Sequence, residues 1–237
     1  SSMNLIEMNS ISKSYRNIGF ETKVLKDVTL HIKEGDYVSI IGPSGAGKST
    51  LMAIMGCLAQ PTSGEYILDY EEVGKLNDRK LSRVRNEKIG FVFQAFHLLP
   101  GVTALENVIL PFVYAKNPPS NIKERARELL AKVGLEHRLH HTPGQLSGGE
   151  QQRVTIARSL VNDPRIILAD EPTGNLDSKN GVETMKTFDN LIKEGKTIVL
   201  ITHDSEVAKH AGRIISILDG QIAADSNVNY EEQARSL

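Results

Sequence analysis

The fold of this chain follows from the stretch Gly42-Pro43-Ser44-Gly45-Ala46-Gly47-Lys48-Ser49. It fits the pattern G-x-x-x-x-G-K-[ST], the phosphate-binding loop of nucleoside triphosphatases. The apolar residues 37–41 before it predict a short buried strand, and residues 49–55 after it predict a helix. A glycine-rich turn with a surface lysine is the alternative, but the strand–loop–helix context favours a phosphate loop.

Glycines let backbone N–H groups turn inward onto phosphate oxygens, and the N-terminus of the following helix adds partial positive charge. We expect Lys48 to reach the β- and γ-phosphates and the Ser49 hydroxyl to ligate Mg²⁺. The predicted phosphate-contacting residues are Gly42, Pro43, Ser44, Gly45, Ala46, Gly47, Lys48, Ser49 and Thr50.

Length and composition are those of an ordinary globular protein. The 237 residues suffice for one large α/β domain, or for a core with a smaller inserted subdomain. The net charge of −1 gives no global field that favours nucleic acid or an anionic membrane surface. Aromatic residues make up 5% and Trp is absent, which argues against a base-stacking platform for nucleic acid.

The single cysteine, Cys57, cannot form an internal disulfide, which suits a reducing cytosol, and we expect it to be a small core residue. No apolar run approaches the 18 or so residues of a membrane-spanning helix. No signal peptide is visible, because Ile6 is soon followed by charged residues. Work at a membrane would therefore need another chain or segment to span it.

Periodicity and turn residues divide the chain into an α/β core and a helical insertion. We expect one domain over residues 3–225, with a helical subdomain at about 95–162, and a polar tail over 226–237. Apolar runs predict strands over 5–8, 24–32, 65–68, 166–169, 197–202 and 213–218, the last entering a hairpin at Asp219-Gly220. Apolar stripes predict helices over 121–133 and 150–161 and a helix through Val182, Met185, Phe188, Leu191 and Ile192, interrupted by Asp189.

Two acids, Asp170 and Glu171, end the apolar strand over 166–169. Ligands of α/β folds bind at the carboxyl ends of the strands, so these acids are expected near the phosphates. Asp170 fits the acid that holds Mg²⁺, through water, and Glu171 is placed to accept a proton from, or to orient, the attacking water. Solvated acids at strand ends are common, so the acid pair alone is weak evidence for a catalytic site. Together with a phosphate loop in the same chain, it becomes strong evidence.

A second anion-binding pattern is Leu146-Ser147-Gly148-Gly149-Glu150-Gln151, at the start of a predicted helix. A serine three residues before Glu is also typical of a helix cap. One triphosphate does not need two such sites in one chain.

The sequence closely resembles the ATPase subunit of ATP-binding cassette (ABC) transporters, whose signature the stretch 146–151 matches. The resemblance runs from about Met3 to Ile222 and implies a phosphate-loop core with an antiparallel β subdomain and an inserted helical subdomain. It also implies roles for further residues. Tyr15 would stack on adenine, Gln94 would sense Mg²⁺ and the attacking water, and His203 would contact the γ-phosphate. Asn175-Leu176-Asp177 would cross to a partner subunit.

The resemblance thus implies catalytic residues Lys48, Glu171 and His203, and Mg²⁺ ligands Ser49, Gln94 and Asp170. It also implies a head-to-tail dimer, in which a second copy of the chain completes each ATP-binding site. The residues supplied by that second copy would be Ser147, Gly148, Gly149, Glu150 and Asp177. Taken singly, Tyr15 could be a half-exposed strand residue, Gln94 a surface residue, and His203 the end of a strand.

Finer similarity is to the macrolide-exporter and lipoprotein-release branch, seen in residues 54–58, 91–99, 103–108 and 169–177. That branch implies an integral-membrane permease partner and a place at the cytoplasmic face of the cell membrane, with no nucleic acid bound. Coupling to the permease is expected near Gln94 and residues 97–105. The cell-division ATPase of this branch is also similar, so the cargo stays open.

Other functions of ABC-type and nucleotide-binding proteins are the alternatives to transport. Translation-type ABC ATPases carry two cassettes and DNA-repair types carry long coiled coils, and this chain shows neither. A regulatory ATPase that acts through a permease-like partner on cell-wall or division machinery would look nearly the same. A catalytically weak nucleotide-binding scaffold is disfavoured by the intact Lys48, Glu171 and His203.

Overall fold

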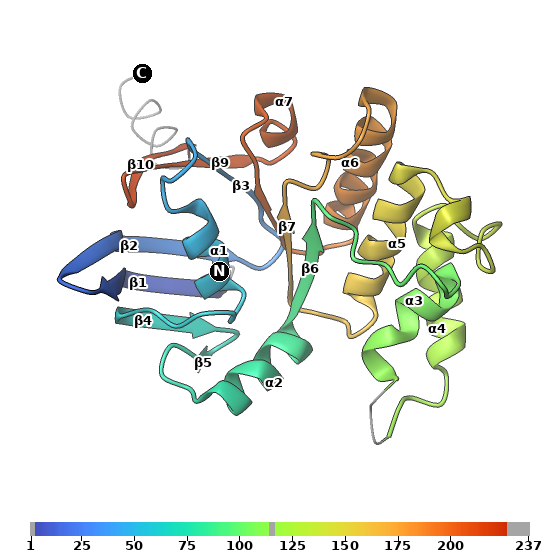
Figure 1. Cartoon of the computed structure of the whole chain (residues 1–237), viewed down its shortest axis with the longest axis horizontal. Helices are drawn as coiled ribbons and strands as arrows, with labels where there is room; N and C mark the ends of the chain where they lie inside the picture. The colour runs from blue at the N-terminus through green and yellow to red at the C-terminus, as the bar shows by residue number, and fades with distance from the viewer. Residues whose placement is uncertain (1–2, 114–116, 227–237) are drawn as a thin grey trace.

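Two β-sheets and a group of helices make up the chain in the computed structural model, which describes residues 3–113 and 117–226 (Figure 1). The polar tail expected over 226–237 therefore lies outside the described residues, apart from Ser226. The first sheet is antiparallel, in the order β2-β1-β4-β5. Its strands are β1 (Asn4–Asn17), β2 (Phe20–Lys33), β4 (Ser63–Leu68) and β5 (Glu71–Glu72).

The second sheet has six strands in the order β10-β9-β3-β8-β7-β6 and is parallel except at its β10 edge. All four residues of β8 are buried, as expected of a strand covered on both faces. The strands are β3 (Tyr37–Ile41), β6 (Ile89–Phe93), β7 (Ile166–Asp170), β8 (Ile198–Ile201), β9 (Arg213–Leu218) and β10 (Gln221–Asp225).

The helices fall into two groups. Those of the core are α1 (Lys48–Met55), α2 (Asp78–Lys88), α6 (Ser178–Lys193) and α7 (Ser205–Ala208). Those beyond the β6–β7 edge, to the right in Figure 1, are α3 (Ala104–Ile109), α4 (Ile122–Lys132) and α5 (Gly148–Leu160). The short 3₁₀ turns are η1 (Leu110–Phe112) and η2 (Pro143–Gln145). The α/β fold class with an antiparallel β subdomain and a helical insertion matches the prediction.

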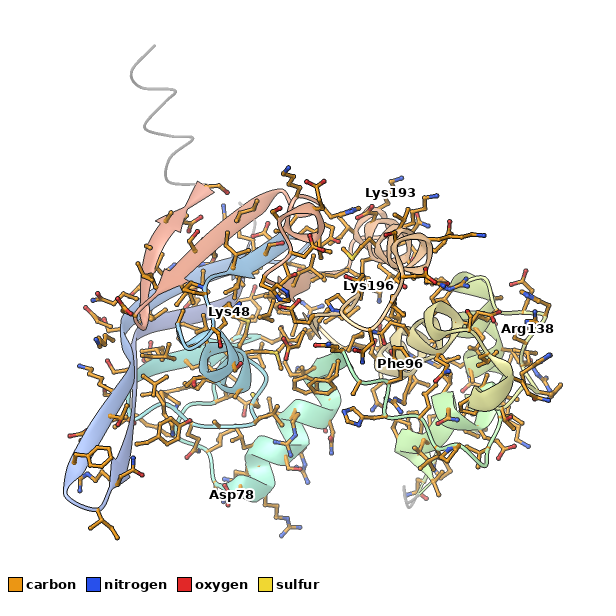
Figure 2. All side chains as sticks on the ribbon, turned by 45° about the horizontal axis from the view of Figure 1, so that its top comes forward. Lys48, Asp78, Phe96, Arg138, Lys193 and Lys196 are labelled. Atoms are coloured by element: carbon orange, nitrogen blue, oxygen red, sulfur yellow. The ribbon has the colours of Figure 1, made fainter. Side chains whose placement is uncertain are left out.

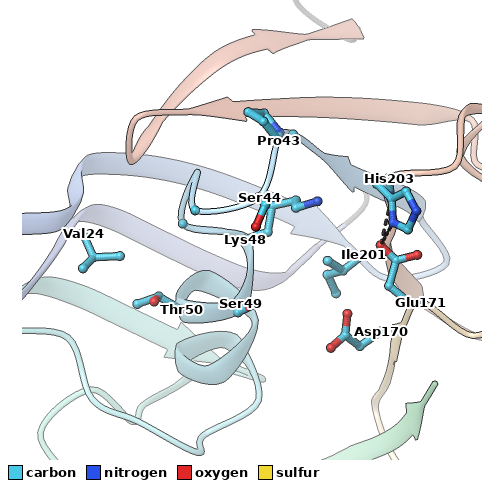
Figure 3. Close-up of a pocket in the computed structure, with 13 residues that line it drawn as sticks. Val24, Pro43, Ser44, Lys48, Ser49, Thr50, Asp170, Glu171, Ile201 and His203 are labelled. Carbon is cyan, nitrogen blue, oxygen red and sulfur yellow. Dashed lines mark hydrogen bonds and ion pairs between the residues drawn. The ribbon is translucent and has the colours of Figure 1, made fainter. Parts of the chain in front are cut away.

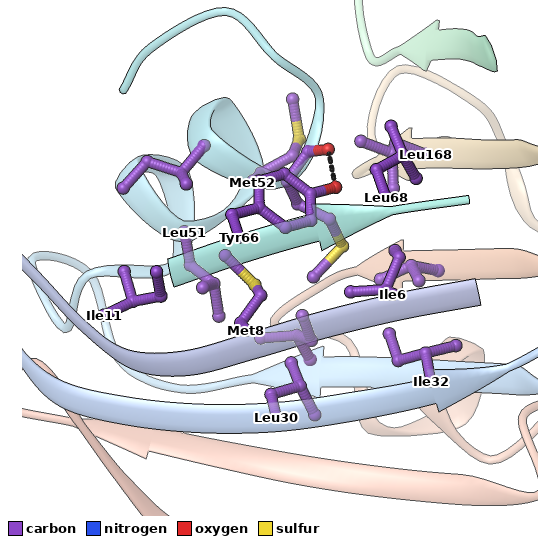
Figure 4. Close-up of a cluster of buried hydrophobic side chains, with 14 of the residues drawn as sticks. Ile6, Met8, Ile11, Leu30, Ile32, Leu51, Met52, Tyr66, Leu68 and Leu168 are labelled. Carbon is purple, nitrogen blue, oxygen red and sulfur yellow. Dashed lines mark hydrogen bonds between the residues drawn. The ribbon is translucent and has the colours of Figure 1, made fainter. Parts of the chain in front are cut away.

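Two apolar clusters hold these layers together. One lies between the antiparallel sheet and α1, where Tyr66 is fully enclosed and donates its hydroxyl proton to the carbonyl of Met55 (Figure 4). The other lies among α3, α4, α5 and α6 and includes Val154 and Phe188. Cys57 belongs to the first cluster, is fully buried, and has a pKa raised to about 12 by burial above all.

Three sequence expectations needed adjustment. β1 and β2 form one long hairpin that extends past the rest of the sheet, because β4 pairs with β1 only as far as Ser12. α2 was not anticipated, since only Leu81 and Val84 of its eleven residues are buried. Val182, placed on the apolar face of α6, is 55% exposed. In the described residues, no helix is long and apolar enough to cross a membrane.

An ion-pair cluster around Asp69 ties the two sheets together. Asp69 follows β4, and its carboxylate accepts hydrogen bonds from Lys88 at the end of α2 (2.6 Å) and from Arg165 just before β7 (3.3 Å). Arg165 also pairs with Glu34 after β2 at 3.3 Å. Burial acts to raise the pKa of Asp69, but the hydrogen bonds and charges of Lys88 and Arg165 outweigh it and lower that pKa.

We expect Asp69→Asn to lower the free energy of unfolding at pH 7 by about 1–3 kcal/mol, the range for a hydrogen-bonded charged group. The folded pKa of Asp69 lies below its unfolded value of about 4, so its stabilisation is complete above the unfolded pKa. It is lost as the pH falls through the folded pKa. Urea unfolding from pH 7 to pH 3 should therefore show the variant and wild type converging in acid.

Asp163→Asn is the matched control, because both aspartates have positive φ (49° and 51°), which Asn tolerates. The ion pair of Asp163 with Lys196 is exposed, with 71% of the Asp163 side chain accessible, so this change should cost less than about 0.5 kcal/mol. Equal losses in the two variants, or a pH-independent loss at Asp69, would contradict the assignment.

Candidate active site

The loop between β3 and α1 has the backbone shape that its glycines allow. Gly42 passes so close to β9 that an added Cβ would lie 2.3 Å from the carbonyl oxygen of Ile217. Gly47 caps α1 at φ 105°, a conformation that other residues rarely adopt. A larger residue at either position would push the loop away from the end of β3.

The loop presents unpaired N–H groups to a cleft of about 670 Å³. Within the described part of the chain, the N–H groups of Gly45, Gly47 and Lys48 donate to no protein acceptor, whereas that of Ala46 donates to the Pro43 carbonyl at 3.2 Å. Free N–H groups and a helix N-terminus together make an anion-binding surface. Figure 3 shows Lys48 at the centre of this cleft.

The predicted acids line the opposite wall of the same cleft (Figure 3). Asp170 ends β7, and Glu171 follows at φ 45°, a left-handed conformation uncommon for Glu. Burial raises the pKa of Asp170, the charge of Glu171 raises it further, and Lys48 partly offsets both. A cation bound beside Asp170 would favour the ionised form of this half-buried carboxylate.

Glu171 is held by the segment that follows β8. Its Oε2 accepts a hydrogen bond from the Thr202 hydroxyl (3.1 Å), and its Oε1 accepts one from the His203 N–H (2.8 Å). The ring Nδ1 of His203 lies 2.7 Å from the same Oε1. Because an ionised carboxylate only accepts hydrogen bonds, this contact places a proton on Nδ1. The ring itself is exposed, with 78% of the side chain accessible.

Most of the predicted phosphate and catalytic residues thus meet in one cleft. Ala46 is buried behind the loop instead of lining the cleft, and Val24 and Ile201 are lining residues that the sequence analysis did not name. The predicted residues that line it are Gly42, Pro43, Ser44, Gly45, Gly47, Lys48, Ser49, Thr50, Asp170, Glu171 and His203.

Gln94 and Tyr15 lie outside the lining of this cleft. Gln94 follows β6 and forms two hydrogen bonds with Asn175, each 3.1 Å long. The Gln94 Nε2 donates to the Asn175 Oδ1, and the Asn175 Nδ2 donates to the backbone carbonyl of Gln94. Gly174 packs so closely that an added Cβ would lie 2.6 Å from the Gln94 amide carbon. Tyr15 is 46% exposed on β1, with the Lys13 ammonium 5.3 Å from its ring centre.

The N-terminus of α5 is a second, separate anion-binding candidate. Ser147 caps it: its Oγ accepts the N–H of Glu150 (3.1 Å), while its own N–H donates to the Glu150 carboxylate (3.0 Å). The helix cap that the pattern suggested is therefore present. It uses a lone pair of the Ser147 hydroxyl and leaves that hydroxyl proton available, so capping and anion binding are compatible.

The remaining residues predicted for this second site surround Ser147. Glu150 also pairs with Arg138 at 3.2 Å. Gly149 packs against α6, where an added Cβ would lie 2.3 Å from the Asn180 side-chain oxygen, and Asp177 caps that helix by accepting the Asn180 N–H (2.8 Å). In Figure 2, Lys48 and Arg138 lie well apart on the molecule. Ser147 is exposed and does not line the Lys48 cleft.

Comparison with known proteins identifies the family. The profile of the ABC transporter family matches residues 25–174, more than half of the chain. The chain belongs to the ABC transporter family. It is 52% identical over 221 residues to "Uncharacterized ABC transporter ATP-binding protein YvrO" of Bacillus subtilis, covering 93% of this chain and 96% of that protein.

This ABC cassette is also similar to a protein named for macrolide export and to a cassette whose dimer has been solved. It is 51% identical over 222 residues to the "Macrolide export ATP-binding/permease protein MacB" of Escherichia coli, covering 94% of this chain and 34% of that protein. A dimeric post-hydrolysis structure of the ATP-binding cassette MJ0796, bound to ADP and Pi, superimposes with a TM-score of 0.81. The identity there is 47%, and the match covers 93% of this chain and 97% of that one.

This ABC chain is accordingly an ATP-binding cassette with ATPase activity, and the predictions of family, fold class and enzyme class are confirmed. The sequence analysis missed two buried polar residues that contact the loops of the site, Thr202 and Gln152. Thr202 reads as the end of an apolar strand, and Gln152 reads as an ordinary polar position on a helix. Only the three-dimensional contacts show that both are buried.

We expect Glu171→Gln to keep ATP affinity near the wild-type value and to lower the hydrolysis rate by about 10²–10⁴, the usual contribution of a general base. The amide preserves shape and can still accept the His203 N–H, but it cannot take a proton. Phosphate release should be measured beside binding of a fluorescent ATP analogue.

Lys48→Ala provides the contrast, since it removes the cation that faces the phosphates and should weaken binding itself. Near-normal turnover in Glu171→Gln would remove Glu171 from the reaction. Near-normal ATP binding and turnover in Lys48→Ala would contradict the assignment of residues 42–49 as the phosphate-binding loop.

Proposed function

We propose that two copies of this cassette pair head to tail, each ATP lying between the Lys48 loop of one copy and Ser147 of the other. The observation that carries this proposal is the exposed, capped N-terminus of α5, which has a free hydroxyl proton but does not line the Lys48 cleft. A helix end prepared for an anion and set away from its own chain's nucleotide is best used by a neighbour. The dimeric MJ0796 structure supports such pairing.

In the cleft, the loop N–H groups and Lys48 hold the phosphates of ATP. Glu171 accepts a proton from the attacking water or orients it, and His203 meets the γ-phosphate through its exposed ring. Both Glu171 oxygens are engaged by Thr202 and His203. The Nδ1 atom of His203 faces Glu171, so the Nε2 atom of the exposed ring is the one assigned to the phosphate. Tyr15, half-exposed on β1, is assigned to the adenine ring.

Ser49, Asp170 and Gln94 are the proposed Mg²⁺ ligands. All three offer oxygen atoms, the donor that Mg²⁺ prefers, and Asp170 and Ser49 line the same cleft. Among the described residues, no group of three or more His, Cys, Asp or Glu side chains forms a complete cage. Mg²⁺ usually keeps waters and substrate phosphates as ligands, so a partial protein site fits it. When bound, Mg²⁺ would neutralise charge on the phosphates.

In the partner's site, Gly148 and Gly149 would bring the backbone of α5 close to the γ-phosphate. Glu150 would act by fixing Ser147, because its carboxylate is already engaged by the Ser147 N–H and by Arg138. Asp177, at the start of α6 beside Gly149, would cross to the other copy. Residues 3–225 would act as one domain. The helical part at about 95–162 would carry Ser147 to Glu150, whereas Asp177 lies after it, at the start of α6.

We propose further that the dimer drives an integral-membrane permease from the cytoplasmic face of the membrane, in the direction of export. The MacB relative is named as a combined ATP-binding and permease protein, and this chain spans about a third of it. A cleft of about 320 Å³ beside β6, lined by residues that include Phe93 and Arg158, is a suitable docking surface. Arg158 donates to the carbonyls of Phe96 and His97 and so fixes the segment after Gln94.

The second candidate is a regulatory ATPase that acts on cell-wall or division machinery through a permease-like partner. It would use the same dimer and the same cleft, so only the membrane partner separates the two. Isolating the complex from its native membrane and sequencing the co-purified chain decides between them. A permease with a substrate-sized cavity supports export, and a partner bound to a cell-wall hydrolase supports regulation.

We expect Ser147→Asp to leave ATP binding by the monomer unchanged but to abolish ATP-dependent dimerisation. Aspartate is as good a helix cap as serine, so α5 should be preserved, while its negative charge would repel the partner's γ-phosphate. Gel filtration with ATP, in the Glu171→Gln background that retains nucleotide, should show dimers for the parent and monomers for the double variant.

Ser147→Asn is the matched control, because it also caps helices and adds no charge. It should retain most of the dimerisation. If Ser147→Asp prevents the isolated monomer from binding ATP, then Ser147 acts on its own chain's nucleotide and the head-to-tail arrangement fails.

A further inference from the structure

Gln152 is a fully buried polar residue on α5, five positions after the cap at Ser147. Its amide nitrogen donates two hydrogen bonds, to the carbonyl of Phe93 (2.9 Å) and to the carbonyl of Pro172 (2.6 Å). Its amide oxygen lies 2.7 Å from the hydroxyl of Thr155, one turn further along the helix and also buried. Both N–H protons and the oxygen of the side chain are therefore engaged.

The two carbonyls that Gln152 binds belong to the loops that carry the catalytic groups. Phe93 is the last residue of β6 and directly precedes Gln94. Pro172 directly follows Glu171. Phe93 and Asp170 are paired across the sheet, so the two carbonyls leave neighbouring strands at the same edge. One side chain of the helical part thus contacts the backbone next to both Gln94 and Glu171.

We propose that Gln152 is a positioning residue for ATP hydrolysis: it sets the Gln94 and Glu171 loops relative to α5, whose N-terminus carries Ser147. This inference rests on the roles proposed above for Gln94 and Ser147. Gln152 does not line the nucleotide cleft, so it acts through the two backbone carbonyls. A shift of α5 then changes the position of the catalytic loops, and closure of the partner's site is transmitted to the reacting groups.

The chemistry of glutamine suits this task. A glutamine amide has two N–H donors on one nitrogen, which matches two carbonyls that converge from adjacent strands. The two carbonyls fix which end of the amide faces them, because only the amide nitrogen can donate. The Thr155 hydroxyl lies 2.7 Å from the amide oxygen and 2.6 Å from the Gln152 backbone carbonyl, and its single proton serves both acceptors. An apolar residue of similar size would remove both hydrogen bonds, and the loss of a partner is costly for the buried carbonyl of Pro172.

The first test compares Gln152→Leu with Val154→Ala, on the same helix. Both side chains are fully buried, so both variants lose core stability, but only the first loses contact with the two loops. We expect Gln152→Leu to lower kcat at least tenfold, with monomer affinity for a fluorescent ATP analogue and Mg²⁺ changed less than twofold. Val154→Ala should lower kcat less than threefold. Equal kcat values for the two variants would show that Gln152 is merely a core residue.

The second test is a double-mutant cycle on kcat with Gln94→Ala. If Gln152 acts through the Gln94 loop, the double variant should be about as slow as the slower single variant. If the two fold-changes simply multiply, Gln152 does not act through that loop. Thr155→Val removes the hydroxyl beside the Gln152 amide oxygen and should show the same pattern in the cycle, with a smaller loss in kcat. This variant serves as the test if Gln152→Leu does not fold.

The outcomes separate this inference from the proposed function. A wild-type kcat in Gln94→Ala would overturn the role of Gln94 in hydrolysis. A lowered kcat in Gln94→Ala with a normal kcat in both Gln152→Leu and Thr155→Val would leave that role intact and overturn the role of Gln152.

Discussion

The in-register pairing of four parallel strands is the constraint on which the site depends. Phe93 pairs with Asp170, Asp170 with Ile201, and Ile201 with Ile40, so one row of residues crosses β6, β7, β8 and β3. The segments after these strands therefore emerge at one edge of the sheet, and they carry Gln94, Glu171, Thr202 and the phosphate loop. A slip of one residue in any pair would turn a catalytic side chain to the other face. The burial of β8 and β7 on both faces makes such a slip costly.

Polar side chains at this edge are hydrogen-bonded to one another. Glu171 is engaged by Thr202 and His203, and Gln94 by Asn175. Glu171 and Gln94 thus each have a protein partner that can be exchanged for a phosphate, a cation or a water. Exchange of polar partners costs less than ordering a free side chain, because the rotamer entropy has already been lost. The left-handed backbone at Glu171 is part of the same arrangement.

Local sequence patterns were sufficient for the parts of the molecule that depend on local rules. The phosphate loop, the acids at the end of β7 and the cap at Ser147 each follow from a few adjacent residues with known backbone demands. The hydrophobic runs of β3, β7 and β8 likewise identify buried strands. The parts that failed depend on distant contacts. Val182 fits the apolar stripe of α6 but lies where that helix faces solvent, and α2 has too few buried residues to show a stripe.

Gln152 and Thr202 show why the site could not be completed from the sequence. A glutamine in a helix is usually exposed. Here Gln152 is buried because it donates hydrogen bonds to two backbone carbonyls, which are 59 and 20 residues away in the sequence. Thr202 is the end of a strand in sequence, and its contact with Glu171 spans 31 residues. The resemblance to ABC ATPases could name residues in known motifs, whereas the polar links between those motifs emerged only from the packed structure.

The burial of Cys57 has a practical consequence for measuring motion. The thiolate is the reactive form of cysteine, and a pKa of about 12 leaves on the order of one thiol in 10⁴ ionised at pH 8. The sequence contains no other cysteine, and this one is fully buried. These 237 residues should therefore react very slowly with maleimide dyes. A cysteine introduced on an exposed face could be labelled selectively without first removing Cys57 from the core, which makes the folded protein a ready host for distance measurements by fluorescence.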